Sequence, residues 1–440
     1  MIRSGNNEKA YYILHFLLII LGTTQIAGAS VANIGISICV AIIVCICPIQ
    51  QNIVMLFLLA PYFNMFSVEL GTTSLYYIYA LVFLFKYFKT SKWALKKSKL
   101  FVILAFAVIT ISWLNIAVQV KWLVLFALLV INYKDKLFID RFPLLVKHIA
   151  FSTITSSIIG YIMLVEGKSI YTQSYIYSSQ GNVTRFAGLV GDSVFYGQFA
   201  VMVIGAVLAL VLMEKMSESM GYSITAVLSY FIVITFSKTA IILLAFVVVS
   251  YFLAFIHKNL HKKRTVYRAL IVLVFLVVAV IGGVLYISSH LSNPMINMYA
   301  IRFTSGDLWT GRSSVTDNYL QKLYSSFVHI FIGMSYNDYT QNGVLVGQTM
   351  ITRAHNIYIE TICLFGLLPA VALFGFCLRK IGSYIKNRNN IFFMTPFMVL
   401  VLSGVSLHGH IEWPYYFLLS IALGTMDYWN NERMTEWGIQ

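Results

Sequence analysis

Long apolar runs alternate with short polar segments along the whole chain of 440 residues. An α-helix needs about 20 mostly apolar residues to cross the hydrocarbon of a bilayer, and runs near that length recur from one end to the other. We predict fourteen spans, near 11–30, 31–47, 52–68, 72–88, 100–118, 121–133, 144–165, 194–213, 221–237, 239–256, 269–288, 355–377, 391–407 and 415–429. Because 31–47, 121–133 and 415–429 are short, a count of twelve also fits the pattern.

Two polar segments are much longer than the others, at residues 166–193 and 289–354. Loops of this length in a compact protein are usually functional or disordered. These two mix aromatic residues with Gly, Asn and Ser, so we expect them to fold over one face of the membrane. The sequence therefore predicts an all-α polytopic protein, with residues 1–440 forming a single integral membrane domain.

Composition supports a membrane protein and charge gives its orientation. Hydrophobic residues make up 59% and charged residues 11% of the chain, whereas soluble domains carry about a quarter charged residues. With the N-terminus in the cytoplasm, 23 of the 31 Lys and Arg residues fall on the cytoplasmic side, and the 16 acidic residues divide equally. This distribution follows the positive-inside rule. It explains the net charge of +15 without a nucleic acid partner, and we expect the cytoplasmic basic patches to contact anionic lipid.

The first apolar run ends near Ala27-Gly28-Ala29, as a cleaved signal peptide does, but it is long for one, so we expect it to be retained as a span. All five cysteines lie inside apolar runs, and Cys45-Ile46-Cys47 lacks the spacing of a zinc site. We therefore expect no structural disulfide, no metal and no other cofactor.

Ionisable residues are scarce in the middles of the spans, where transporters and pumps usually need them. They gather instead at the outer ends of spans and in the two long loops. The candidates are Lys168, Arg185, Asp192, Lys238, Arg302, Asp307, Arg312, Lys322, Arg353, His355, Glu360 and Glu412. This points to a site at the outer interface, where a lipid-linked substrate has its head in water and its tail in the bilayer.

The first constellation is Arg185-Phe186-Ala187-Gly188-Leu189, followed by Gly191-Asp192-Ser193 and Gly197. An outer arginine opposes the charge rule, and its planar fork of donors suits a phosphate. Glycines at a helix start allow backbone amides to approach an anion. The alternative is an arginine paired with Asp192 or with a lipid phosphate, and the sequence alone favours neither.

Two further cations lie on the outer side. Arg312 follows Thr310-Gly311 in the large loop, where a solvated arginine beside a turn is the simpler interpretation, although a diphosphate would use a second cation opposite Arg185. Lys238, in the tight turn Phe236-Ser237-Lys238-Thr239, either adds charge to the same site or extends along the membrane surface.

The third constellation is Arg353-Ala354-His355-Asn356, at the start of the span near 355–377. Helical spacing would put His355 and Gly366 on one face and Asn356 and Glu360 on another, with a kink at Pro369.

Neighbouring arginines would keep His355 neutral, as a general base requires, whereas an interfacial histidine bonded to a loop carbonyl is the simpler interpretation of the residue alone. Glu360 needs a partner inside the membrane. Glu412, in His408-Gly409-His410-Ile411-Glu412-Trp413, belongs to a polar helix end that supports the same site.

Taken together, these motifs resemble the bacterial O-antigen polymerase and O-antigen ligase superfamily. Arg185 to Leu189 matches an Arg/Lys-x3-Leu pattern, Gly311-Arg312 a Gly-Arg in the large loop, and His355-Asn356 to Gly366 a His-Asn-x9-Gly pattern. Pro369 stands where the family often has Gly, Thr or Tyr, and Ser237-Lys238-Thr239 has Lys where the family has Arg. The resemblance covers roughly residues 100 to 430.

The resemblance implies a membrane glycosyltransferase of the C-type fold, with a metal-independent, inverting transfer at the outer face of a bacterial inner membrane. The donor would be a glycan on undecaprenyl diphosphate, a leaving group held by Arg185 and Arg312 with Lys238 beside them. His355 would accept the proton of the acceptor hydroxyl, supported by Asn356, Glu360, Arg353, Asp192 and Glu412.

Three functions fit this sequence. The first, which we favour, is an O-antigen or capsule polysaccharide polymerase whose acceptor is another lipid-linked repeat unit, working with a chain-length regulator protein. The second is a ligase that transfers the glycan to lipid A-core or another terminal acceptor. The third is a lipid-linked sugar transporter, which requires charged residues along a path through the spans.

Overall fold

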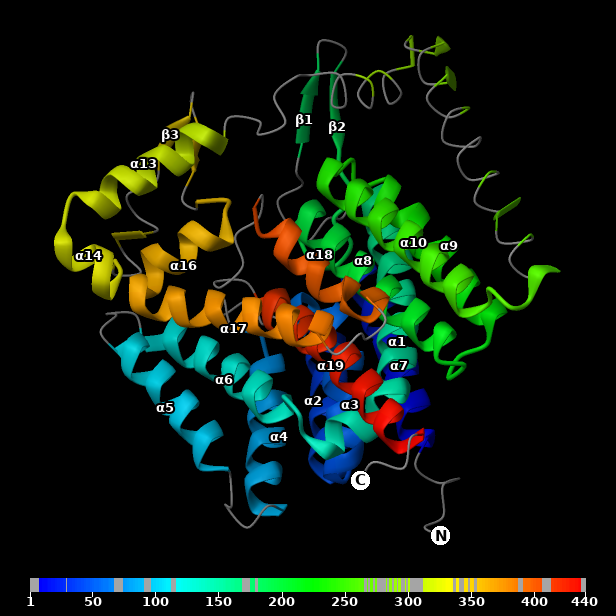
Figure 1. Ribbon diagram of the computed structural model, residues 1–440, viewed down its shortest axis with the longest axis horizontal. Coiled ribbons are helices and arrows are strands. Elements are labelled where there is room, and N and C mark those ends of the chain that lie inside the picture. The colour runs from blue at the N-terminus through cyan, green and yellow to red at the C-terminus, as the bar shows by residue number, and fades with distance from the viewer. Residues whose placement is uncertain are drawn as a thin grey trace.

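The protein is a tilted bundle of helices with a small helical extension on one side (Figure 1). The computed structural model describes residues 8–28, 30–66, 74–90, 96–111, 116–167, 175–178, 181–264, 312–334, 338–339, 344–346, 349–351, 354–386, 391–405 and 413–436, with isolated residues between 267 and 300.

Helices account for most of the described chain. They are α1 (Lys9–Ile26), α2 (Ser30–Ile46), α3 (Ile49–Leu59), η2 (Ala60–Phe66), α4 (Tyr76–Thr90), α5 (Lys97–Ile111), α6 (Ile116–Asn132), α7 (Lys136–Val165), α8 (Ser193–Leu212), α9 (Glu218–Val233), α10 (Lys238–Lys258), α13 (Arg312–Tyr324), α14 (Phe327–Ile332), α16 (Ile357–Phe365), α17 (Leu367–Lys386), η3 (Ile391–Met394), α18 (Thr395–Ser403) and α19 (Trp413–Glu436).

Six of the described helical segments are long and apolar enough to cross a membrane. They are Lys9–Ile26, Ile49–Phe66, Lys136–Val165, Ser193–Leu212, Lys238–Lys258 and Leu367–Lys386. The chain is therefore a helical, membrane-embedded protein, as its sequence predicts. The count of fourteen spans and the cytoplasmic N-terminus stay predictions, and most of 269–288 lies outside the described residues.

Strands are the exception to the predicted all-helical fold. In the segment between α7 and α8, β1 (Tyr175–Ser178) pairs antiparallel with β2 (Gly181–Thr184). In the segment between α14 and α16, β3 (Val344–Val346) pairs antiparallel with β4 (Thr349–Ile351). Both two-stranded hairpins lie in the two segments that the sequence marks as long loops, so these segments contain regular structure.

Helix α8 lies at the centre of the bundle, and all 20 of its residues are buried. It packs against α7, α9, α10, α18 and α19. Small residues bring these helices close, because a side chain at Gly197 would meet Ala240 of α10 and one at Gly205 would meet Pro396 of α18. Close packing of small residues holds helices together where lipid removes the hydrophobic driving force.

Three lysines hold the ends of helices on the side that the charge pattern assigns to the cytoplasm. Each ammonium group donates to backbone carbonyls at the C-terminal end of α2, α6 or α8, where a helix leaves carbonyls without intrahelical partners. The bonds run from Lys86 to Val44 and Cys47, from Lys99 to Ile131 and from Lys258 to Leu212, at 2.6–2.7 Å. The positive charges also complement the negative ends of these helix dipoles.

The predicted continuous span at 355–377 is wrong, because two helices, α16 and α17, meet at a break at Gly366. Gly366 has φ +78°, and a side chain there would collide with the Phe331 carbonyl of α14. The predicted kink at Pro369 is also wrong, since this proline lies in the first turn of α17, where proline is tolerated. His355 precedes α16 and Gly366 ends it, so the two do not share a helix face.

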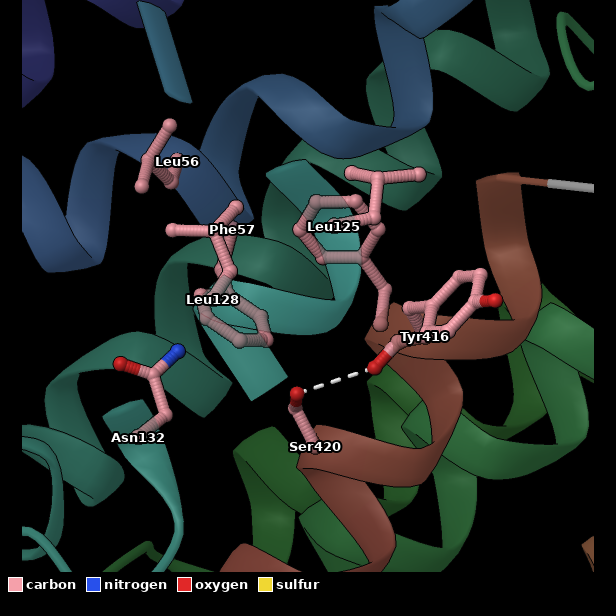
Figure 2. A pocket seen from close by; sticks show the side chains of 8 residues that line it. Leu56, Phe57, Leu125, Leu128, Asn132, Tyr416 and Ser420 are labelled. Atoms are coloured by element: carbon pink, nitrogen blue, oxygen red, sulfur yellow. Dashed lines mark hydrogen bonds between the residues drawn. The ribbon is translucent and has the colours of Figure 1, made fainter. Parts of the chain in front are cut away.

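A small cavity lies where α3, α6 and α19 meet (Figure 2). Leu56, Phe57, Leu125 and Leu128 give it an apolar lining, and the Ser420 hydroxyl donates to the Tyr416 carbonyl beside it at 2.9 Å. None of the residues predicted from the sequence to form a site lines this cavity.

We predict that Gly197→Val separates α8 from α10 and lowers stability. Its Cβ would lie 2.4 Å from that of Ala240, and overpacking of this kind costs about 1–3 kcal/mol. Thermal unfolding of the purified protein in detergent measures the effect. Gly35→Val is the matched control, because nothing lies within 4 Å of a Cβ at that exposed position. Equal melting temperatures for both variants would contradict the close packing.

Candidate functional site

Two adjacent residues of α8 join the elements that carry the predicted motifs. Gly197 touches Ala240 in the first turn of α10, and Gln198 donates a hydrogen bond to Ser403, the last residue of α18. Helices α16, α18, α8 and α10 accordingly lie in a row across the upper half of the molecule (Figure 1). The start of α10 and the end of α18 therefore flank the same turn of α8.

The start of α16 is bonded in turn to the end of α18. The amide of Ile357 donates to the Gly404 carbonyl at 2.8 Å, and the Asn356 side chain donates to the Val405 carbonyl at 3.3 Å. Asn356 and its neighbour His355 are thus attached to α18 immediately after the residue that contacts α8. The first and third sequence constellations consequently occupy one end of the bundle.

Arg185 is held against the turn between α9 and α10. Its Nε donates to the Thr235 carbonyl at 2.9 Å, and the next residue, Phe186, bonds through its amide to the Ile234 carbonyl at 3.3 Å. Lys238 begins α10 three residues after Thr235. The backbone bonds therefore bring Arg185 and Lys238 to one corner of the molecule, as a shared anion site requires.

Three helices begin at this end of the bundle, and a side chain caps each of them. Asp192 accepts hydrogen bonds from the amides of Val194 and Phe195 at the start of α8. Ser237 caps α10 and Asn356 caps α16 in the same way. The positive ends of three helix dipoles face this region, which favours a bound anion. Asp192 serves α8 here as an N-cap.

His355 has a backbone conformation that is uncommon for its residue type. Its φ is +49°, in the left-handed region, where non-glycine residues cluster at functional and strained positions. The preceding amide, of Ala354, donates to the Tyr339 hydroxyl at 2.9 Å, and the following residue, Asn356, caps α16. The turn that carries His355 is therefore held on both sides, by the large loop and by α16.

Tyr339 joins the large loop to this turn. Its carbonyl accepts a hydrogen bond from the Tyr319 hydroxyl of α13 at 2.9 Å. Burial raises the pKa of the Tyr339 phenol well above its ordinary value, and the Glu360 carboxyl raises that pKa further. The phenol is therefore neutral near pH 7 and keeps its hydrogen bonds.

Glu360 is fully buried in the first turns of α16. Its carboxyl interacts electrostatically with Tyr339 and with Tyr415 and Tyr416 of α19. Glu360 therefore lies among tyrosines just after the His355 turn, and its supporting role stays a prediction. It is too deeply buried to meet a substrate directly.

The other predicted site residues lie wholly or partly outside the described part of the chain. Arg312 is the first residue of α13, but its side chain lies outside the described part of the chain. Arg353 and Glu412 lie outside the described residues altogether. The second constellation is therefore located only by the backbone of α13.

Sequence reasoning missed the residues that support the motifs from elsewhere in the chain. Asn64 donates to the carbonyls of Leu189 and Val190, at 3.1 and 2.8 Å, and so supports the loop after Arg185. Its only sequence signal is a polar side chain inside a predicted span. Tyr339 has no such signal, because tyrosine is common throughout the large loop.

No family model, curated protein or solved structure matches this chain. The family resemblance therefore rests on the short sequence motifs alone.

The arrangement combines two chemical capacities. Arg185, Lys238 and the starts of three helices form a positive corner that suits a phosphate group. An imidazole on a fixed turn can accept a proton when it is neutral. A site with both is suited to transfer a group from a phosphate leaving group to a hydroxyl.

We predict that Tyr339→Phe loosens the His355 turn. The substitution leaves the buried Ala354 amide without its acceptor, which costs about 1–3 kcal/mol. Hydrogen exchange of residues 354–359 should accelerate, while exchange in α8 stays unchanged. Tyr324→Phe is the matched control, since Tyr324 belongs to the same large loop, ends α13 and is 70% exposed. Unaltered exchange at 354–359 in Tyr339→Phe would refute the link.

Proposed function

We propose that this protein is a polysaccharide polymerase that joins lipid-linked repeat units at the outer face of a bacterial inner membrane. The donor is a glycan on undecaprenyl diphosphate, and the acceptor is a sugar hydroxyl of a second lipid-linked repeat unit. The observation that carries the proposal is that adjacent residues of α8 contact two helices of the site region. Gly197 meets the start of α10, next to the Arg185–Lys238 corner, and Gln198 bonds to the end of α18, which holds the His355 turn.

The positive corner is assigned to the diphosphate. An arginine offers paired donors to phosphate oxygens, and Lys238 adds a second charge. The bond from Arg185 Nε to the Thr235 carbonyl fixes the guanidinium beside the start of α10. In this proposal Arg312, at the start of α13, supplies a further cation from the large loop.

His355 is assigned as the general base. As the acceptor oxygen bonds to the anomeric carbon, the bond from that carbon to the diphosphate oxygen breaks and its electron pair leaves with the diphosphate. The hydroxyl proton passes to the imidazole. Cations at the leaving group stabilise the charge that develops there, which lowers the barrier without a metal ion.

A transporter fits the described residues less well. A substrate path needs charged or polar groups through the spans. Among the described residues, the ion pair from Lys380 of α17 to Asp427 of α19, at 3.0 Å, is largely buried and joins two helices. Such a neutralised pair serves packing, whereas the candidate site gathers at one end of the bundle.

We predict that His355→Ala lowers the rate of transfer by at least about a hundredfold, the contribution of a general base. The measurement is the rate of glycan transfer by purified protein supplied with the native lipid-linked repeat unit. His290→Ala is the matched control, because His290 is an exposed histidine of the same large loop and should leave the rate unchanged. Full activity in His355→Ala would remove the base assignment.

We predict that Arg185→Ala weakens transfer roughly a hundredfold, the cost of losing one donor to a developing charge. Arg185→Lys should recover part of the rate, because a point charge replaces the planar fork. Arg379→Ala, an exposed arginine of α17, should behave as the unmodified protein does. Equal rates for Arg185→Ala and Arg379→Ala would contradict the diphosphate assignment.

A further inference from the structure

The corner between α13 and α14 exposes large apolar side chains. The exposed fraction is 70% for Tyr324, 76% for Phe327 and 58% for both Val328 and Ile332, and Phe331 is also exposed. No residue of α14 is buried. A concentration of this kind in a polar loop is unusual, because soluble surfaces seldom expose contiguous apolar patches.

The other face of α13 packs against α16. Val315, Tyr319 and Leu323 of α13 are buried against Cys363 and Leu364 of α16 in a small separate core. Helix α13 is thus fixed by one face, while the turn after it points its apolar side chains outward. The exposure of this corner is therefore a feature of a packed structure.

The apolar corner continues directly into a candidate membrane span. The amide of Met334, just after α14, donates to the Cys363 carbonyl, and Gly366 leaves room for the Phe331 carbonyl. Helix α17 begins at this contact, and its first turns expose Leu368 by 68% and Val371 by 59%. Only 11% of the most apolar stretch of α17 is buried within the protein. Lipid therefore has to cover its remaining surface.

We propose that the apolar corner, residues 324–332, inserts into the hydrocarbon of the adjacent lipid leaflet. Its side chains are continuous with the exposed first turns of α17, so the membrane that surrounds α17 reaches the corner as well. Aromatic residues such as Tyr324 and Phe327 suit the boundary between headgroups and acyl chains. The proposal thus assigns a membrane anchor to a segment of the large loop, which the sequence predicts only to fold over the membrane face.

The anchor would set the position of the other end of α13. Arg312 and Tyr324 are twelve residues apart, or roughly 18 Å along a helix. Anchoring the Tyr324 end holds the Arg312 end at a fixed distance from the hydrocarbon, where a lipid-linked diphosphate lies. This last consequence rests on the proposed function, but insertion of the corner does not.

The test uses the unmodified protein in nanodiscs of phosphatidylethanolamine and phosphatidylglycerol. Two photoactivated diazirine reagents, one dissolved in the lipid and one in water, are applied separately, and labelled peptides are identified by mass spectrometry. We expect residues 324–332 to take up the lipid-soluble reagent as strongly as residues 367–371 of α17. Residues 317–321 of α13, where Asp317 and Gln321 are exposed, should take up the water-soluble reagent.

Labelling of 324–332 by the water-soluble reagent would overturn the proposal, because the corner would then lie in water. Labelling by neither reagent would overturn it too, because protein would then cover the corner. The labelling does not depend on glycan transfer activity. It can therefore support insertion of the corner even if the proposed function is wrong.

Discussion

The close contact of α8 with its neighbours is the constraint on which the rest of the structure depends. A helix whose 20 residues are all buried can pack on five others only if some of its positions carry no side chain. Gly197 meets that requirement next to Ala240, and the adjacent Gln198 bonds to Ser403. These two contacts determine which helix ends meet, and so which polar groups share one end of the bundle.

The two ends of the bundle present opposite ends of helix dipoles, and the end with the positive dipole ends suits an anion-binding site. Lysine side chains satisfy the carbonyls at the C-terminal ends of α2, α6 and α8. At the opposite end of α8, the starts of α8, α10 and α16 present their dipoles' positive ends, capped by Asp192, Ser237 and Asn356. Arg185 therefore adds charge where backbone dipoles already favour an anion.

The sequence predicts the helices well because their signal is local. Apolar runs of spanning length locate most of the described helices. The break at Gly366 could not be predicted, since its cause is the backbone of Phe331, over thirty residues earlier. Only that contact distinguishes a glycine that ends a helix from one inside a continuous span.

For the candidate site too, the sequence indicates individual residues but not the contacts that group them. Arg185, Lys238 and His355 were recognisable from residue type and spacing, but their grouping depends on hydrogen bonds between distant segments. Asn64 and Tyr339 could not be found, because each acts on a backbone group of a remote loop. A side chain that bonds a carbonyl or an amide leaves no pattern of residue types in the sequence.

The most direct test of the account supplies purified protein with one undecaprenyl-diphosphate-linked repeat unit and no other acceptor or metal ion. The products are separated on a gel. A polymerase should give a ladder, because each product is again a lipid-linked acceptor. No product from the native repeat unit, with transfer restored by a different terminal acceptor, would contradict the polymerase and identify a ligase.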